Sequence, residues 1–122
     1  MDTGYILKEL VELNNNCLKK PFSYEDTKKL QKDFKKEFLA IQEESFNADF
    51  NDYCMIIVGT ISYILKGKTA AIPPRQKDLL KLDFFDRFSQ YSFLKDKLTL
   101  YSSLHDEYNN YEKARKLILK VI

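Results

Sequence analysis

The chain has 122 residues, 44% apolar and 31% charged, so it can bury one hydrophobic core and is too apolar to be disordered. The formal net charge of +2 excludes the strongly basic footprint of a dedicated nucleic-acid-binding protein. Three glycines and three prolines are too few for the turns of a β-sandwich, so we predict one all-α domain over residues 1–122.

Two amphipathic helices are predicted in the first third of the chain. Residues 3–18 place apolar side chains three or four positions apart, which is typical of a helix with one buried face. Ser23 can cap a second helix, which we expect to run from Tyr24 to Glu44. The polar face of this second helix is rich in lysine: Lys28, Lys29, Lys32, Lys35 and Lys36.

The stretch from Asn47 to Gly67 is apolar on almost every side and lies at the centre of the predicted fold. Its β-branched residues also favour a strand. The run continues well beyond the usual strand length of about five or six residues without a turn residue, however, and this favours a helix. We therefore predict a buried central helix over residues 49–66, with Gly67 as the glycine that follows many helix ends.

The remaining segments are also predicted to be helical. Pro74 is expected to begin a helix that runs to Phe88, with a break near Ser89. A further helix carries residues 93–101, and the last helix starts near His105, giving a bundle of about six to seven helices around the central one. Cations crowd the end of the last helix, where they suit its dipole: Lys113, Arg115, Lys116 and Lys120.

Cysteine usage and the N-terminus indicate a cytoplasmic protein. Cys17 and Cys54 are far apart in the sequence and form no C-x-x-C motif, so we predict two free thiols in a reducing compartment. The first ten residues lack the pattern of a signal peptide. The apolar run from Tyr53 to Leu65 is too short and too polar to span a bilayer, so we expect no membrane partner.

The catalytic potential of the chain rests on its single histidine, His105. With Asp106 and Glu107 it could act in acid–base chemistry, but the same residues fit the first turn of a helix. Small helical ribonucleases of the HEPN class resemble this chain in size and in their closing tyrosine-rich helix. Their motif has an arginine five to seven residues before the histidine, where this chain has residues 98–100, which contain none. We predict no enzymatic activity, small-molecule substrate, cofactor or metal.

Two features are typical of recognition surfaces. One is a group of carboxylates before and within the start of the central helix, flanked by phenylalanines, which suits a basic groove on another protein. A capped helix N-terminus on a solvated loop explains the same acids. The other is a set of tyrosines, which are enriched at interfaces but equally common at the edge of a helical core. The candidate partner-binding residues are Glu43, Glu44, Asp49, Asp52, Tyr91, Tyr108 and Tyr111.

Residues 82–119 carry a D-F-F opening, an aromatic Q-Y-x-F-L turn and a closing Y-E-x-A-R-x-L helix. This stretch is similar to small helical immunity proteins of bacterial toxin systems, contact-dependent growth inhibition among them. The resemblance implies a non-enzymatic, cytoplasmic protein that binds a cognate toxin domain stoichiometrically and blocks its active site. Many such toxins are nucleases with basic clefts, so a nuclease domain is one candidate partner for the acidic residues named above.

An alternative interpretation is a small regulatory or nucleic-acid-binding helical protein, of phage origin for example. It would use the lysine-rich face of residues 28–36 or the basic residues 113–120. Because arginine, the better phosphate ligand, is absent from residues 28–36 and acids are interspersed there, a solvated helix face explains the same pattern. We therefore do not expect nucleic acid as a partner.

Overall fold

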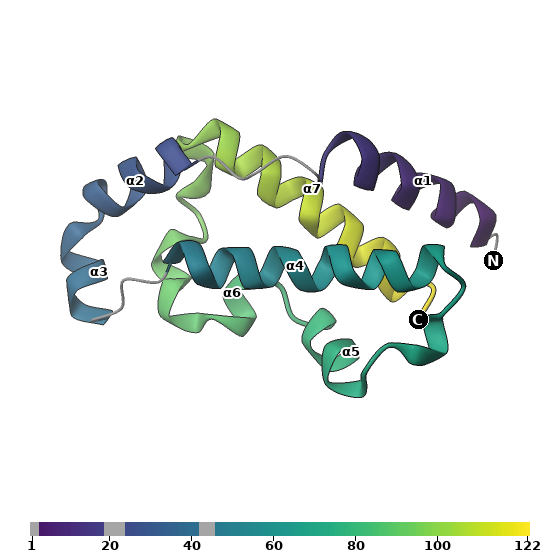
Figure 1. Ribbon diagram of the computed structural model, residues 1–122. Helices are drawn as coiled ribbons and strands as arrows, with labels where there is room; N and C mark the ends of the chain where they lie inside the picture. The colour runs from purple at the N-terminus through teal and green to yellow at the C-terminus, as the bar shows by residue number, and fades with distance from the viewer. Residues whose placement is uncertain (1–2, 19–23, 42–45) are drawn as a thin grey trace.

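The computed structural model describes residues 3–18, 24–41 and 46–122, and these form helices joined by short turns (Figure 1). No strand occurs in this part of the chain, so the all-α prediction is confirmed. The elements in chain order are α1 (Thr3–Asn16), α2 (Tyr24–Asp33), α3 (Lys35–Ile41), α4 (Phe46–Leu65), the 3-10 turn η1 (Thr69–Ala71), α5 (Pro74–Leu80), α6 (Phe84–Arg87), the 3-10 turns η2 (Ser89–Leu94) and η3 (Leu98–Leu100), and α7 (Ser102–Leu119).

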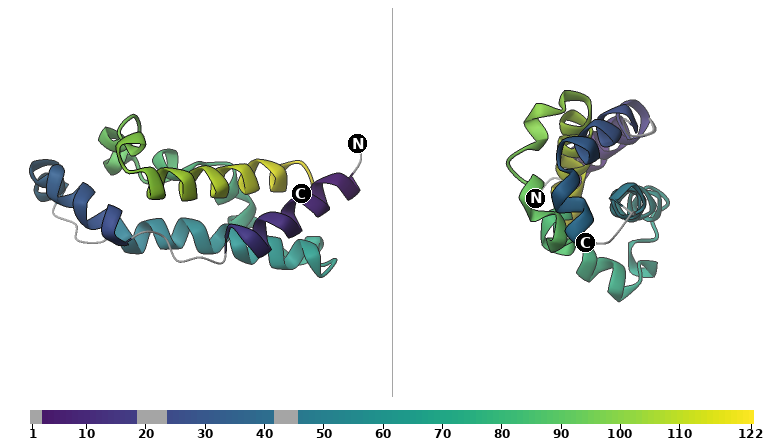
Figure 2. Two further views of the ribbon diagram at one scale, coloured as in Figure 1. Left: turned by 90° about the horizontal axis from the view of Figure 1, so that it is seen from above. Right: turned by 90° about the vertical axis from the view of Figure 1, so that its left-hand side faces the viewer.

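Helix α4 is the centre of the core, as predicted. Figure 2 shows α4 and α7 running alongside each other, and both of them contact α1. The buried positions of α4 recur every three or four residues along most of its length: Phe46, Phe50, Tyr53, Cys54, Ile57, Thr60, Ile61 and Ile64. Within the described residues, no helix is long and apolar enough to cross a membrane.

The end of α4 confirms the predicted glycine cap. Gly67 has a φ of +70°, a conformation that a residue with a Cβ adopts only at a cost. The Gly67 N–H donates to the carbonyl of Ile64 at 3.0 Å, and the Lys68 N–H donates to the carbonyl of Tyr63 at 2.9 Å. This pair of bonds is a Schellman motif, which satisfies carbonyls that the helix itself leaves free.

The single helix predicted over residues 24–44 is interrupted at Phe34, which separates α2 from α3. Residues 42–44 lie outside the described part of the chain. Phe34, at the interruption, and Phe38, one turn later in α3, both pack against Phe93, with ring centroids 5.8 and 5.5 Å apart.

The helix predicted from Pro74 to Phe88 begins at Pro74 but divides into α5 and α6. Asp83 causes the division, because its extended backbone and side chain cap α6 instead of continuing α5. The Asp83 carboxylate accepts a hydrogen bond from the Asp86 N–H at 2.8 Å. The helix predicted over residues 93–101 is likewise replaced by the short turns η2 and η3.

The start of α7 lies slightly before His105 and is held by acids from α2. No side-chain cap comes from Tyr101, the residue that precedes the helix. Instead, the Asp26 carboxylate accepts a hydrogen bond from the Leu104 N–H at 2.9 Å. The Tyr101 hydroxyl donates to Asp33 at 2.7 Å. A negative charge at this helix end is favourable because the N-terminal N–H groups carry partial positive charge.

A buried ion pair joins three helices near the middle of the molecule. Arg115 of α7, only 8% exposed, donates from Nε and Nη2 to the two carboxylate oxygens of Glu112 at 2.7 and 2.8 Å. Its Nη1 donates to the carbonyl of Leu80 at the end of α5 at 3.0 Å. The hydroxyl of Tyr53 on α4 donates to the same Glu112 carboxylate.

Gly59 lies within α4 and Gly67 caps its end. Replacing each by alanine should change the stability of the protein in opposite directions. Gly67→Ala should lower the free energy of unfolding by about 1–2 kcal/mol, because alanine is strained at positive φ. Gly59→Ala should raise it by about 0.5–1 kcal/mol, because a Cβ there meets nothing within 4 Å and alanine favours the helix. Urea denaturation followed by circular dichroism measures both, and shifts of the same sign would contradict these opposite roles.

Candidate functional site

Three of the predicted partner-binding residues, Asp52, Tyr91 and Tyr108, contact residues of α6. Glu43 and Glu44 lie outside the described residues. The others lie on three elements: Asp49 and Asp52 on α4, Tyr91 on η2, and Tyr108 and Tyr111 on α7. Whether these residues contact a partner stays a prediction, but their surroundings separate those that support the fold from those that a partner can reach.

Asp49 and Tyr91 form a contact inside the molecule. The Tyr91 hydroxyl donates to the Asp49 carboxylate at 2.6 Å. The Tyr91 ring is 0% exposed, stacks on Phe84 with ring centroids 5.6 Å apart, and meets Phe46 edge-on at 5.1 Å. In this conformation Tyr91 offers a partner no ring surface, and its polar tip is satisfied by Asp49.

Asp52 is the more accessible of the two described carboxylates. Its side chain is 55% exposed and forms an ion pair with Arg87 of α6, whose side chain is 16% exposed. The Arg87 guanidinium also lies 4.8 Å from the centre of the Phe88 ring. Because an ion pair of this exposure contributes about 1 kcal/mol or less, Asp52 is not required to hold the fold.

The two tyrosines of α7 also differ in their accessibility to a partner. Tyr111 is buried, and its hydroxyl donates to the carbonyl of Leu18 at 3.1 Å, which ties the end of the first segment to α7. Tyr108 is half-buried. Its ring stacks on Tyr53 with centroids 6.0 Å apart and packs against Phe85 at 5.6 Å. Of the three predicted tyrosines, Tyr108 is therefore the one that remains reachable from solvent.

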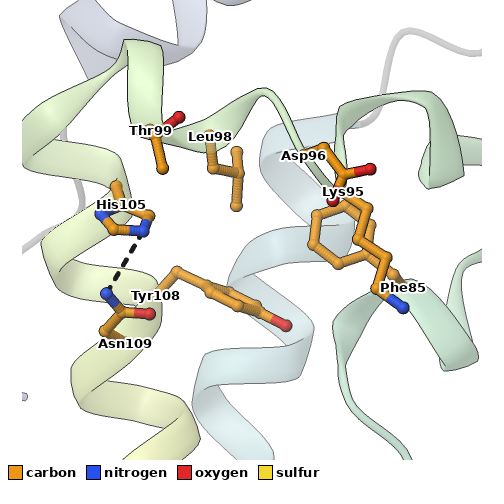
Figure 3. Close-up of a pocket in the computed structure, with 8 residues that line it drawn as sticks. All are labelled: Phe85, Lys95, Asp96, Leu98, Thr99, His105, Tyr108 and Asn109. Atoms are coloured by element: carbon orange, nitrogen blue, oxygen red, sulfur yellow. Dashed lines mark hydrogen bonds between the residues drawn. The ribbon is translucent and has the colours of Figure 1, made fainter.

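Tyr108 lines a pocket of about 240 Å³ between α6, the segment from η2 to η3, and the start of α7 (Figure 3). His105 also borders it, and its Nε2 lies 3.4 Å from the Asn109 amide nitrogen. Sequence reasoning missed the pocket, because no spacing in the chain links its walls. The lining residues are Phe85, Lys95, Asp96, Leu98, Thr99, His105, Tyr108 and Asn109.

Burial shifts the pKa of ionisable groups in the core around α4. Burial raises the pKa of the Cys54 thiol, and Cys54 and Cys17 are both free, as predicted. Burial likewise raises the pKa of the Tyr53 hydroxyl, and the charge of Glu112 adds to this effect. Among the described residues, no cluster of three or more side chains is arranged to hold a metal ion.

The raised pKa values predict a loss of stability in alkali. Burial holds the pKa of Tyr53, Tyr108 and Tyr111 above the ordinary value of about 10, so the unfolded chain releases these protons first. The free energy of unfolding should therefore fall as pH rises above about 10, by up to about 1.4 kcal/mol per pH unit for each hydroxyl that stays protonated. Urea titrations at pH 9, 10 and 11 measure this fall.

Tyr108→Phe is the control for the alkaline effect, because it keeps the ring and removes one raised hydroxyl. The free energy of unfolding should fall less steeply above pH 10 in this variant, because one fewer hydroxyl stays protonated in the folded state after it has ionised in the unfolded chain. An unchanged slope would mean that the Tyr108 hydroxyl does not contribute to the alkaline loss.

The contact between Asp49 and Tyr91 predicts a thermodynamic coupling. Asp49→Ala and Tyr91→Phe should each lower the free energy of unfolding, because each leaves one partner of a part-buried hydrogen bond unsatisfied. A double-mutant cycle should give a coupling of about 1–3 kcal/mol, which is typical of a bond to a charged group. Strictly additive effects would show that Asp49 is available for other contacts.

Comparison with known proteins places the chain in a family. It is 30% identical over 74 residues to the immunity protein WapI of Bacillus subtilis subsp. natto (strain BEST195). The match covers 61% of this chain and 60% of that protein, so the chain spans less than two thirds of its relative's length. No solved structure matches. The family model of YxiJ-like proteins matches residues 8–119, nearly the whole chain, which therefore belongs to the YxiJ-like protein family.

Proposed function

We propose that this chain is an immunity protein that binds a cognate toxin domain stoichiometrically and blocks its active site. The observation that carries the proposal is the similarity to the immunity protein WapI. The immunity-like pattern of residues 82–119 also supports it. In this role the protein acts from the cytoplasm by binding alone and needs neither a cofactor nor a chemical step.

The proposed contact surface lies around the start of α4 and α6. Asp52 supplies an exposed carboxylate there, and Glu43 and Glu44 add two acidic residues just before α4. Acidic groups of this kind steer a basic partner surface into register and accelerate association. A nuclease domain, whose cleft must attract phosphates, is the toxin class that fits this charge best.

Asp49, Tyr91 and Tyr111 contribute to this surface from below. The hydrogen bond from Tyr91 to Asp49 holds η2 against α4, and the hydrogen bond from Tyr111 to Leu18 ties α7 to the end of the first segment. A surface that is already rigid loses little conformational entropy on binding, which favours the tight complex that an inhibitor requires. Tyr108 is the aromatic anchor of the proposed interface.

The proposal is tested with the product of the neighbouring reading frame, taken as the candidate toxin domain. We expect a 1:1 complex with a dissociation constant below about 1 μM, measured by isothermal titration calorimetry. Asp52→Lys should lower the association rate at low salt about tenfold, because it reverses a charge at the proposed interface. Reversing Asp49 as well would confuse the result, because Tyr91 donates a hydrogen bond to it.

Two control variants locate the interface. Asp52→Asn removes the charge without reversing it and should give an intermediate association rate. Lys32→Glu changes an exposed residue of the lysine-rich face and should leave the rate nearly unchanged. If Lys32→Glu slows association and Asp52→Lys does not, the interface lies on α2 and α3. If the neighbouring toxin domain does not bind, the immunity proposal is wrong.

A further inference from the structure

The pocket beside Tyr108 has the size of a single side chain. Its volume of about 240 Å³ is below the roughly 300–1,000 Å³ that is usual for small-molecule sites. Figure 3 shows the Tyr108 ring between His105 and Asn109 on one side and Phe85 with Lys95 on the other. A small pocket beside aromatic rings is the form that binding hot spots take when they receive one anchor residue of a partner.

The aromatic part of the pocket lies in a negative field. Glu112, Asp83 and Asp86 all act on the Tyr108 hydroxyl and, after burial itself, raise its pKa. Only Arg115 acts in the opposite direction, and it is bound to Glu112 through two hydrogen bonds. Asp83 and Asp86 thus add negative charge near the Tyr108 hydroxyl, and Asp83 also acts on Arg115. Asp96 adds a carboxylate in the wall of the pocket.

Lys95 is a cation in the pocket wall, so its positive charge repels a second cation that enters the pocket. Its side chain is exposed and lies beside Phe85 and Asp96 in Figure 3. Neither Lys95 nor Asp96 takes part in an ion pair with another described residue. Lys95 can therefore swing into solvent when another group enters, and its charge should weaken the binding of any cation there.

We propose that this pocket receives an arginine side chain of the partner toxin domain. The inference rests on the proposed immunity function and assigns one contact within it. A planar guanidinium can stack on the part of the Tyr108 ring that borders the pocket, donate to Asp96, and reach the Thr99 and Asn109 oxygens at the rim. Toxin surfaces that bind phosphates use arginine for this purpose, so one inserted arginine would be withdrawn from the toxin's own substrate.

The first test uses a free side-chain probe, so that it does not depend on the toxin. Nα-acetyl-argininamide is titrated into the protein and followed by NMR at His105, Tyr108 and Asn109. Nα-acetyl-citrullinamide is the matched control, because it has nearly the same shape and no charge. We expect millimolar binding of the arginine probe and at least threefold weaker binding of the citrulline probe. Equal binding of the two probes would overturn the proposal.

Removing the charge of either wall residue should change the affinity for the arginine probe, and the two changes should have opposite signs. Asp96→Asn should weaken binding of the arginine probe about fivefold, and Lys95→Gln should strengthen it by a similar factor. Both side chains are exposed, so the variants should fold normally. Glu12→Gln and Lys8→Gln on α1 make the same charge changes far from the pocket and should have no effect. The reverse signs would mean that the pocket accepts an anion, which contradicts the proposal.

The same variants are then measured against the toxin domain. Asp96→Asn should raise the dissociation constant of the complex and Lys95→Gln should lower it. If the toxin domain binds and neither variant changes its affinity, the pocket inference is wrong and the immunity function stands. If the toxin domain does not bind while the arginine probe still prefers the pocket, the immunity function is wrong, and the pocket is a guanidinium site for another partner.

Discussion

The buried guanidinium of Arg115 constrains the arrangement of the other elements. An arginine placed in a core must have its N–H groups satisfied, because an unpaired buried charge costs several kcal/mol. Here Glu112 and the carbonyl of Leu80 satisfy them, and the Tyr53 hydroxyl donates to the same carboxylate. The ion pair thus holds the end of α5 and one face of α4 against α7, and it fixes the register of α7 between them.

The position of the proposed binding surface depends on this buried ion pair. Fixing the end of α5 at Leu80 leaves only a short turn before Asp83 starts α6. Helix α6 then presents Arg87 to Asp52, while Phe85 forms a wall of the pocket. Helix α6 therefore contacts both the acidic start of α4 and the pocket. The buried ion pair fixes where α6 begins and so helps to position both.

The elements that could be predicted from the sequence are those set by local chemistry. The length and continuous apolar character of α4, the glycine at its end and the proline that starts α5 all act within a few residues of themselves. The elements that could not be predicted depend on contacts distant in sequence. Asp26 caps a helix through Leu104, 78 residues away, and Arg115, which the sequence places among cations at a helix end, is buried.

Asp49 and Asp52 show why a functional surface is harder to predict than a helix. Both are acids in the first two turns of α4, and sequence spacing gives no reason to treat them differently. The structure separates them by their partners: Asp49 accepts from a buried tyrosine, whereas Asp52 meets a guanidinium at the surface. An acid committed to a buried donor contributes to stability. An acid that is itself exposed can exchange its partner for one on another protein, which makes Asp52 the better candidate for recognition.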